Sequence, residues 1–108
     1  MSKIENLSEV LRDKPPVPVE KETKDVEKQT EYVFESLQKI LKETNASLDD
    51  VVKATIYVTN ISDFSKISPI RNRYFANSKP VSTLVQVSAL VKPECKVEIE
   101  VIAVRRSI

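Results

Sequence analysis

The most regular hydrophobic pattern in the chain runs from Thr23 to about Thr44. Apolar side chains and one threonine recur there every three or four residues, with Lys and Glu at positions between them. The recurring positions are Val26, Thr30, Val33, Leu37, Ile40 and Leu41. A period of 3.6 residues is typical of an amphipathic helix that packs one face on a core. The sequence therefore predicts a helix over residues 23–44.

A shorter pattern of the same period precedes this helix. Four apolar residues of the segment 2–14 fall on one helical face, and Ser2 and Glu5 have the spacing of a capping box. The four are Ile4, Leu7, Val10 and Leu11. The prolines of the next segment, PPVPVE, require an extended connector that reaches about residue 22. We expect residues 1–22 to form a divergent helix or arm with a Pro-rich connector, and residues 23–108 to form the main domain.

Alternating patterns predict three strands in the rest of the chain. Apolar and polar residues alternate in VVKATIYVTN, KPVSTLVQVSAL and KVEIEVIAVRR, at residues 51–60, 79–90 and 96–106. A period of two is typical of a strand with one buried face. Because only the short loop VKPEC separates the last two strands, we expect them to pair as a hairpin. Before the first strand, Ser47 and Asp50 have capping spacing for one helical turn.

A second helix is predicted over residues 61–78, and Pro69 leaves its start open. The helix begins at Pro69 if Ser68 is its N-cap, because proline is favoured at the first helical position. If it begins at Ser62 or Asp63 instead, Pro69 lies inside it and removes a backbone hydrogen bond. The element order of helix, strand, helix, strand, strand predicts an α+β domain with the helices on one face of the sheet.

The two faces of the predicted sheet differ in character. We expect Val81, Thr83, Val85, Val87 and Ala89 to face the helices together with Val97, Ile99 and Val101. The opposite face would then gather Ser82, Leu84, Gln86, Ser88, Glu98, Glu100, Ile102 and Val104. A mixture of aliphatic, short polar and acidic side chains is typical of a subunit interface rather than of a solvent-facing sheet. The sequence therefore predicts an oligomer that buries this second face.

The composition of the chain limits the kinds of functional site that it can form. The chain has no His and no Gly, which removes the commonest general base and every glycine-rich phosphate loop, so no metal site and no cofactor is predicted. Its formal net charge is +1, without a basic cluster that would favour nucleic acid. No apolar run is long enough to span a membrane, and no signal-peptide pattern opens the chain. With Cys95 as its single cysteine, we expect a soluble cytoplasmic protein.

Motifs along most of the chain match those of one protein family. They are Gln29-Thr30, Leu37, ASLDDVVKATIYVTNISDF, Tyr74-Phe75, Pro80 with Val85 and Val87, and VEIEVIAVRR. With these motifs, residues 25–106 resemble the Rid/YjgF family of reactive-intermediate deaminases, whose members are also called translation-initiation inhibitors or L-PSP endoribonucleases. The resemblance implies a chorismate-mutase-like α+β sandwich that assembles as a homotrimer with its sheets inside. The family's first strands are shortened or missing here, and we expect the N-terminal arm to cover the sheet edge they leave.

The resemblance also implies an activity and a site. Family members hydrolyse enamine and imine intermediates released by pyridoxal-phosphate enzymes, such as 2-iminobutanoate, in clefts between subunits. An arginine in a Pro-x-Arg motif binds the substrate carboxylate, and a glutamate in the last strand positions the attacking water. By position the glutamate is Glu98, Ser82 replaces the arginine, and Leu84 occupies a position that is often Cys or Thr. Phe75 and Gln86 complete the expected cleft.

Departures from the family pattern keep three functions open. Ser82 cannot replace a guanidinium, whose charge-assisted hydrogen bond contributes roughly 1.5–3 kcal/mol, and residues 1–22 lack the Gly and Tyr of the family pocket. Glu98 itself has an alternative role, as a carboxylate paired with Lys or Arg. The sequence favours a non-catalytic trimer that binds a small carboxylate or imino acid. The alternatives are a deaminase that uses Arg71, Arg73 or a partner's arginine, and a structural subunit that mixes with a complete family member.

Overall fold

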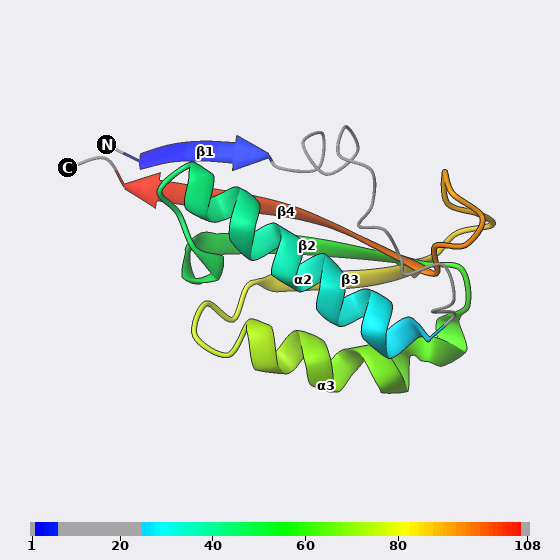
Figure 1. Ribbon diagram of the computed structural model, residues 1–108. Coiled ribbons are helices and arrows are strands. Elements are labelled where there is room, and N and C mark those ends of the chain that lie inside the picture. The colour runs from blue at the N-terminus through cyan, green and yellow to red at the C-terminus, as the bar shows by residue number, and fades with distance from the viewer. Residues whose placement is uncertain (1, 7–24, 107–108) are drawn as a thin grey trace.

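The computed structural model describes residues 2–6 and 25–106 and places them in one mixed sheet covered by two helices (Figure 1). In chain order the elements are β1 (Ser2–Asn6), α2 (Val26–Glu43), β2 (Val51–Val58), α3 (Phe64–Tyr74), β3 (Val81–Gln86) and β4 (Val97–Arg106). Two short 3-10 turns, Leu48–Asp50 and Ile61–Asp63, precede β2 and α3. The predicted α+β class is confirmed.

The sheet has the strand order β1-β4-β2-β3. Helix α3 connects β2 to β3, which pair in parallel, whereas β4 pairs antiparallel with both β2 and β1. The predicted hairpin between the last two strands is therefore wrong, because β4 lies on the far side of β2 from β3. A helical crossover returns the chain parallel to the strand before it, so β3 is placed by α3 and not by the loop that follows it.

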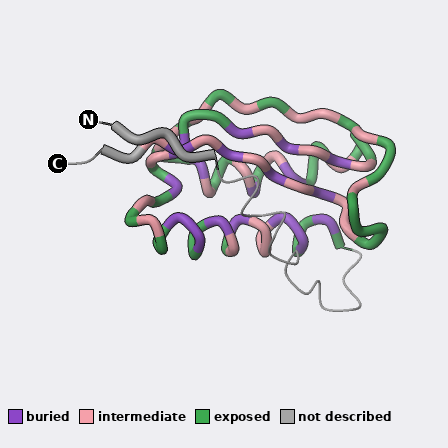
Figure 2. The backbone as a smooth tube through the Cα atoms, turned by 90° about the horizontal axis from the view of Figure 1, so that it is seen from above, coloured by how far each residue is buried: buried purple, intermediate pink, exposed green. Residues whose placement is uncertain are grey.

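Helix α2 forms where the hydrophobic period predicts it. Asp25 is the N-cap, and its side chain accepts a hydrogen bond from the Glu27 amide at 2.9 Å. The buried face of α2 comprises Val26, Gln29, Thr30, Phe34, Leu37, Ile40 and Leu41. Buried positions are concentrated where the helices meet the sheet (Figure 2). Phe34 joins the two helices, because its ring stacks on Tyr74 at 4.7 Å between centroids and meets Phe75 edge-on at 5.1 Å.

The structure tests two local predictions, the capping box before β2 and the starting residue of α3. Ser47 and Asp50 form the predicted capping box, in which the Ser47 amide donates to the Asp50 carboxylate at 2.9 Å. Helix α3 begins after Asp63 and contains Pro69, so the second of the two starting points is the correct one. The proline ring fixes a φ angle that suits a helix, and the missing N–H is the cost of its place inside α3.

The predicted orientation of β3 is reversed. Ala54 and Ile56 of β2 are fully buried beneath the helices, and their register partners on β3 are Ser82 and Leu84. Because paired residues of parallel strands point to the same face, Ser82 and Leu84 face the helices, and Leu84 packs against the core. Val81, expected in the core, is 69% exposed.

Strand β4 has the orientation that its alternation predicts. Val97, Ile99, Val101 and Ala103 are buried against the helices, so the residues between them face the other way. We call that second side the outer sheet face. By register it carries Lys53, Thr55, Tyr57, Val81, Thr83, Val85, Glu98, Glu100, Ile102 and Val104. Strand β3 therefore contributes valines and a threonine to this face, where Ser82, Leu84 and Gln86 were expected.

Residues Ser2–Asn6 form a strand, so the helix predicted for this part of the N-terminal arm is wrong. Strand β1 pairs antiparallel with β4, with Ile4 opposite Val104. The exposed backbone groups along the edge of β4 favour an extended partner over a separate short helix. The arm thus covers one sheet edge, as expected. Residues 7–14 of the predicted helix and the Pro-rich connector lie outside the described residues, and the division at residue 22 stays a prediction.

Candidate functional site

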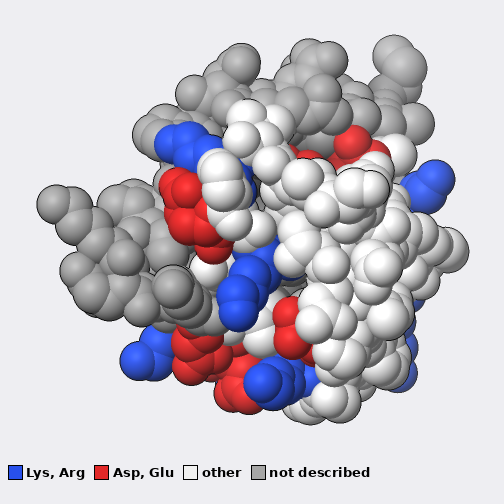
Figure 3. Space-filling model, turned by 90° about the vertical axis from the view of Figure 1, so that its right-hand side faces the viewer, with Lys and Arg blue, Asp and Glu red and all other residues white. Residues whose placement is uncertain are grey.

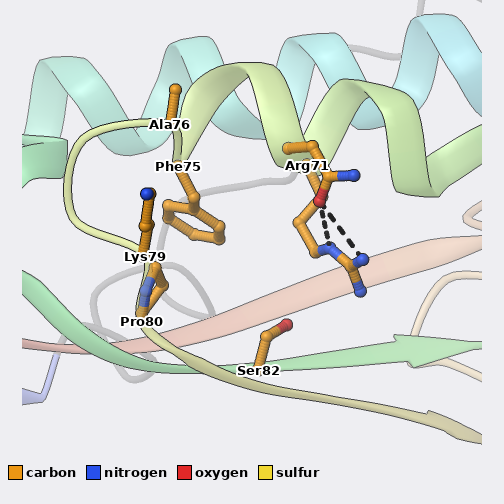
Figure 4. Close-up of a pocket in the computed structure, with 7 residues that line it drawn as sticks. Arg71, Phe75, Ala76, Lys79, Pro80 and Ser82 are labelled. Atoms are coloured by element: carbon orange, nitrogen blue, oxygen red, sulfur yellow. Dashed lines mark hydrogen bonds between the residues drawn. The ribbon is translucent and has the colours of Figure 1, made fainter.

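A pocket opens between the C-terminal half of α3, the turn that follows it and the start of β3 (Figure 4). Its volume is about 450 Å³. The lining residues are Arg71, Asn72, Phe75, Ala76, Lys79, Pro80 and Ser82. Two of these side chains are cationic and none is acidic, so the pocket is suited to an anion.

Arg71 is held in place by its neighbours on α3. Its Nη2 donates to the Ser68 hydroxyl at 3.0 Å and to the Asn72 Oδ1 at 3.3 Å, and its Nε donates to the same Asn72 oxygen at 3.3 Å. The guanidinium carbon also lies 5.6 Å from the centroid of the Phe64 ring. In Figure 4 the Arg71 side chain extends from α3 towards the strand that carries Ser82. These contacts orient the Arg71 guanidinium in the absence of a ligand.

Lys79 supplies the second cation from a turn with an uncommon backbone conformation. Its φ angle is 44°, in the left-handed region, and its amide donates to the Phe75 carbonyl at 2.9 Å. For a residue with a Cβ this conformation costs about 1–2 kcal/mol. The turn brings the exposed Lys79 side chain to the rim of the pocket, directly before Pro80 and β3. Sequence reasoning missed this residue, since a single lysine before a proline carries no signal for a positive φ.

Ser82 lies on the floor of the pocket, at the position where the resemblance places an arginine. Its Oγ is buried and has no hydrogen-bond partner among the described residues. The side chain points from β3 into the space below α3 (Figure 4). A buried hydroxyl without a partner is unfavourable by about 1–3 kcal/mol, so Ser82 is a destabilising feature of the pocket floor in this structure.

The five predicted site residues do not converge within one chain. Phe75 and Ser82 line the pocket together, while Leu84 packs against the core. Gln86 lies at the end of β3, where its Oε1 accepts a hydrogen bond from the Ile61 amide at 2.7 Å. Glu98 is half-buried on the outer sheet face, paired in register with Tyr57.

The two arginines considered as replacement cations are separated by the structure. Arg71 lines the pocket, as described above. Arg73 lies over the Tyr74 ring at 5.1 Å, and its Nη2 is 3.9 Å from a carboxylate oxygen of Glu31. Both side chains of that ion pair are largely exposed, so it contributes little to stability. Arg71 is therefore the arginine that can act in the pocket.

Cys95 lies in the loop before β4 and is half-buried. Burial raises the pKa of its thiol, Glu94 and Glu98 raise it further, and Lys92 opposes them. The thiol is thus protonated near neutral pH, which makes it a poor nucleophile. Gln29 of α2 fixes this loop, since its amide donates to the Glu94 carbonyl at 2.9 Å and accepts from the Lys96 amide at 2.8 Å.

Other site classes find little support in the described part of the chain. Among the side chains that the structure describes, no group of three or more His, Cys, Asp or Glu could hold a metal ion. Neither of the two helices combines the length and apolar character that crossing a bilayer requires. On the side of the molecule shown in Figure 3, acidic and basic side chains are interspersed, whereas a nucleic acid backbone favours a continuous basic surface.

Comparison with known proteins shows where the chain has relatives. The sequence profile of the Endoribonuclease L-PSP family matches residues 16–105. A RutC family protein of Pyrococcus abyssi is 40% identical over 92 residues, which are 81% of this chain and 72% of that protein. Reactive Intermediate Deaminase A of Arabidopsis thaliana, a chloroplast protein, is 40% identical over 78 residues, which are 72% of this chain and 41% of its own length.

Solved structures extend the likeness to the fold. A Rid family protein from Yersinia pestis superposes with a TM-score of 0.71 at 41% identity. The superposition covers 74% of this chain and 64% of that protein, so the chain spans just under two thirds of this relative. The chorismate-mutase-like sandwich implied by the family motifs is thus the fold that these relatives share with the α+β domain described above.

Proposed function

Because the chain belongs to the Endoribonuclease L-PSP family, also known as the Rid/YjgF family, we propose that it is a trimeric member that binds a small carboxylate without hydrolysing it. One relative is named Reactive Intermediate Deaminase A, and the family resemblance implies imine substrates with a carboxylate, so a small carboxylate or imino acid is the ligand class of this proposal. In this proposal the protein is a binding or regulatory protein whose inter-subunit cleft is catalytically degenerate.

One observation carries the proposal. The pocket that contains Ser82 has two cations, Arg71 and Lys79, and no carboxylate, while Glu98 lies on the outer sheet face. An arginine fork suits a carboxylate ligand. Hydrolysis requires in addition a base within hydrogen-bond reach of the attacking water. This combination favours binding over turnover.

The trimer in this proposal is formed by the outer sheet face. Ile102 and Val104 of β4 and the exposed Val81 of β3 give this face an aliphatic component, beside Glu98 and Glu100. Closed symmetric assemblies are the common way to bury such a face. Light scattering should give a trimeric mass at micromolar concentration. Replacing Ile102 with Glu should dissociate it, because a buried unpaired charge is unfavourable.

The binding role is tested by two measurements on the full chain. Calorimetric titration with 2-oxobutanoate, a stable analogue of the imine, should show binding that Arg71→Gln weakens and Arg73→Gln does not. A dehydratase-coupled assay should show the same lifetime of 2-iminobutanoate with and without the protein, next to a complete family member as positive control. A shortened lifetime that Glu98→Gln restores would overturn the non-catalytic role.

A second candidate function is imine hydrolysis with Arg71 as the carboxylate clamp. The presence of Arg71 and Ser82 in one pocket favours it, since the cation then reaches the substrate from α3 instead of from β3. In that case the water-positioning group comes from outside the described pocket. The coupled assay with Arg71→Gln separates the two functions, because only in the second does this variant abolish a measurable rate.

A further inference from the structure

We propose that the pocket between α3 and β3 selects a small dicarboxylate, with one carboxylate bound by Arg71 and the other by Lys79. This inference rests on the proposed carboxylate-binding role and adds the class of ligand. It concerns the two cations of the pocket and the apolar surface between them, and neither the outer sheet face nor Glu98 takes part.

The charge of the pocket favours a dianion. Arg71 and Lys79 both line it, and none of the lining side chains is acidic. A ligand with a single negative charge would neutralise one cation and leave the other paired only with water. Discrimination between ligands follows from such unpaired groups as much as from the contacts that form. A second carboxylate therefore gains affinity that a monocarboxylate cannot.

The arrangement of the two cations favours an elongated acid over a compact anion. In Figure 4 the Lys79 amine and the Arg71 guanidinium lie on opposite sides of the Phe75 ring. Phe75, Ala76 and Pro80 contribute apolar surface to the same pocket, which suits a short hydrocarbon chain. Its volume of about 450 Å³ is in the range of small-molecule sites. A single phosphate would place its whole charge at one end.

The two ends of the pocket hold their cations in different ways. Ser68 and Asn72 accept hydrogen bonds from the Nε and Nη2 of Arg71, and Nη1 has no hydrogen-bond partner among the described residues, so the two N–H groups of Nη1 are left for a ligand. The Ser82 hydroxyl is buried beneath the surface of the pocket and is not counted among the groups that contact the ligand. At the other end the left-handed backbone of Lys79 directs a flexible amine to the rim. The Arg71 guanidinium is thus held in a fixed orientation for one carboxylate, whereas the flexible Lys79 amine contributes a positive charge for the other.

Succinate and butanoate test the selectivity, because they share a four-carbon skeleton and differ in the second carboxylate. Titration calorimetry on the full chain should give a dissociation constant for succinate about two- to fivefold lower than for butanoate or inorganic phosphate, as expected for one added ion pair with an exposed lysine. Equal affinity for succinate and butanoate would overturn the inference and leave the carboxylate-binding role intact. Tighter binding of phosphate would overturn the elongated ligand, and binding of none of the three would overturn both proposals.

Variants then assign the two ends of the ligand. Lys79→Asn removes the amine and keeps a residue that tolerates a positive φ. It should reduce the affinity for succinate to that for butanoate, without changing the latter. Arg71→Gln should weaken both ligands, and Arg73→Gln, which removes the same charge outside the pocket, should change neither. Unchanged selectivity in a folded Lys79→Asn protein, verified by circular dichroism, would contradict the assignment.

Discussion

Ser82 and Glu98 lie on opposite faces of the same sheet. Ser82 is the register partner of the buried Ala54 and faces the helices, whereas Glu98 lies between the buried Val97 and Ile99 and faces outward. The position that the family motif assigns to substrate binding and the position that it assigns to water activation are thus separated by the thickness of the sheet. Any joint action of the two requires Glu98 to work from the outer sheet face, where subunits are expected to meet.

The place of Leu84 leads to a stability prediction. Its side chain faces the helices and packs against the core, so Leu84→Ala should lower the free energy of unfolding by about 1–3 kcal/mol, at the lower end of values for buried leucines because it is only partly buried. Urea denaturation measures this change. Val91→Ala is the matched control, since Val91 is 91% exposed and its truncation should cost less than about 0.5 kcal/mol. A Leu84 variant that dissociates the assembly but keeps its unfolding free energy would return this residue to the subunit interface.

Gln29 gives a second stability prediction, because its side chain is buried. It is 5% exposed, and its amide bridges the Glu94 carbonyl and the Lys96 amide. Gln29→Ala leaves these loop groups without that partner, so we expect a loss of about 1–3 kcal/mol in urea denaturation and faster amide exchange at Lys96. Gln38→Ala on the exposed face of the same helix is the control. Equal losses in the two variants would show that the bridge contributes nothing.

The N-terminal strand gives a prediction about a sheet edge. Deleting residues 1–16 removes β1 and exposes the β4 backbone that now pairs with it. An open edge loses hydrogen bonds and can pair with other chains, so we expect a lower melting temperature and concentration-dependent aggregation. Thermal denaturation followed by light scattering measures both. A truncated protein with unchanged melting temperature and mass would mean that β1 adds nothing to the sheet.

The elements after residue 25 were predictable from the sequence, but β1 was predicted as a helix and the pairing of the strands was not predictable. Helix α2 and strand β4 follow strong periodic patterns, and their buried faces agree with those patterns because packing on one core decides both. Strand β3 carries apolar residues on both faces, so alternation could not say which side meets the helices. Its parallel register with β2 decides this, by pairing Ala54 with Ser82, and that register depends on the crossover through α3.

The candidate site was predictable only in part, for a similar reason. The family motifs located Ser82 and Phe75, both of which line the pocket, and the arginine alternatives included Arg71. Lys79 was missed because its place depends on a left-handed turn in a chain that contains no glycine. Which of the two helix arginines reaches the pocket also follows from the direction of α3 relative to β3, and local sequence does not contain that direction.

The thiol of Cys95 should respond to pH in a defined direction. Burial raises its pKa above that of a free thiol, so iodoacetamide should modify the folded protein more slowly than the protein in denaturant, and the rate should increase only at more alkaline pH. Because the pKa is higher in the folded state, this group favours folding below the usual thiol pKa. That contribution is lost as the pH rises through the folded-state value. Cys95→Ser should lack this alkaline loss, and identical pH profiles of stability for the two proteins would contradict the shift.

Restoring the family's arginine should not restore the family's reaction. Ser82→Arg places a guanidinium on β3 facing the pocket that already holds Arg71 and Lys79, where like charges repel, and Glu98 remains on the other face. Because catalytic groups act together, one restored group recovers little. We expect no faster loss of 2-iminobutanoate in the coupled assay, and weaker binding of succinate because the new side chain fills the site. The double variant Ser82→Arg, Arg71→Gln relieves the repulsion and is the matched control. A rate near that of a complete family member in either variant would show that the missing arginine alone made the protein inactive.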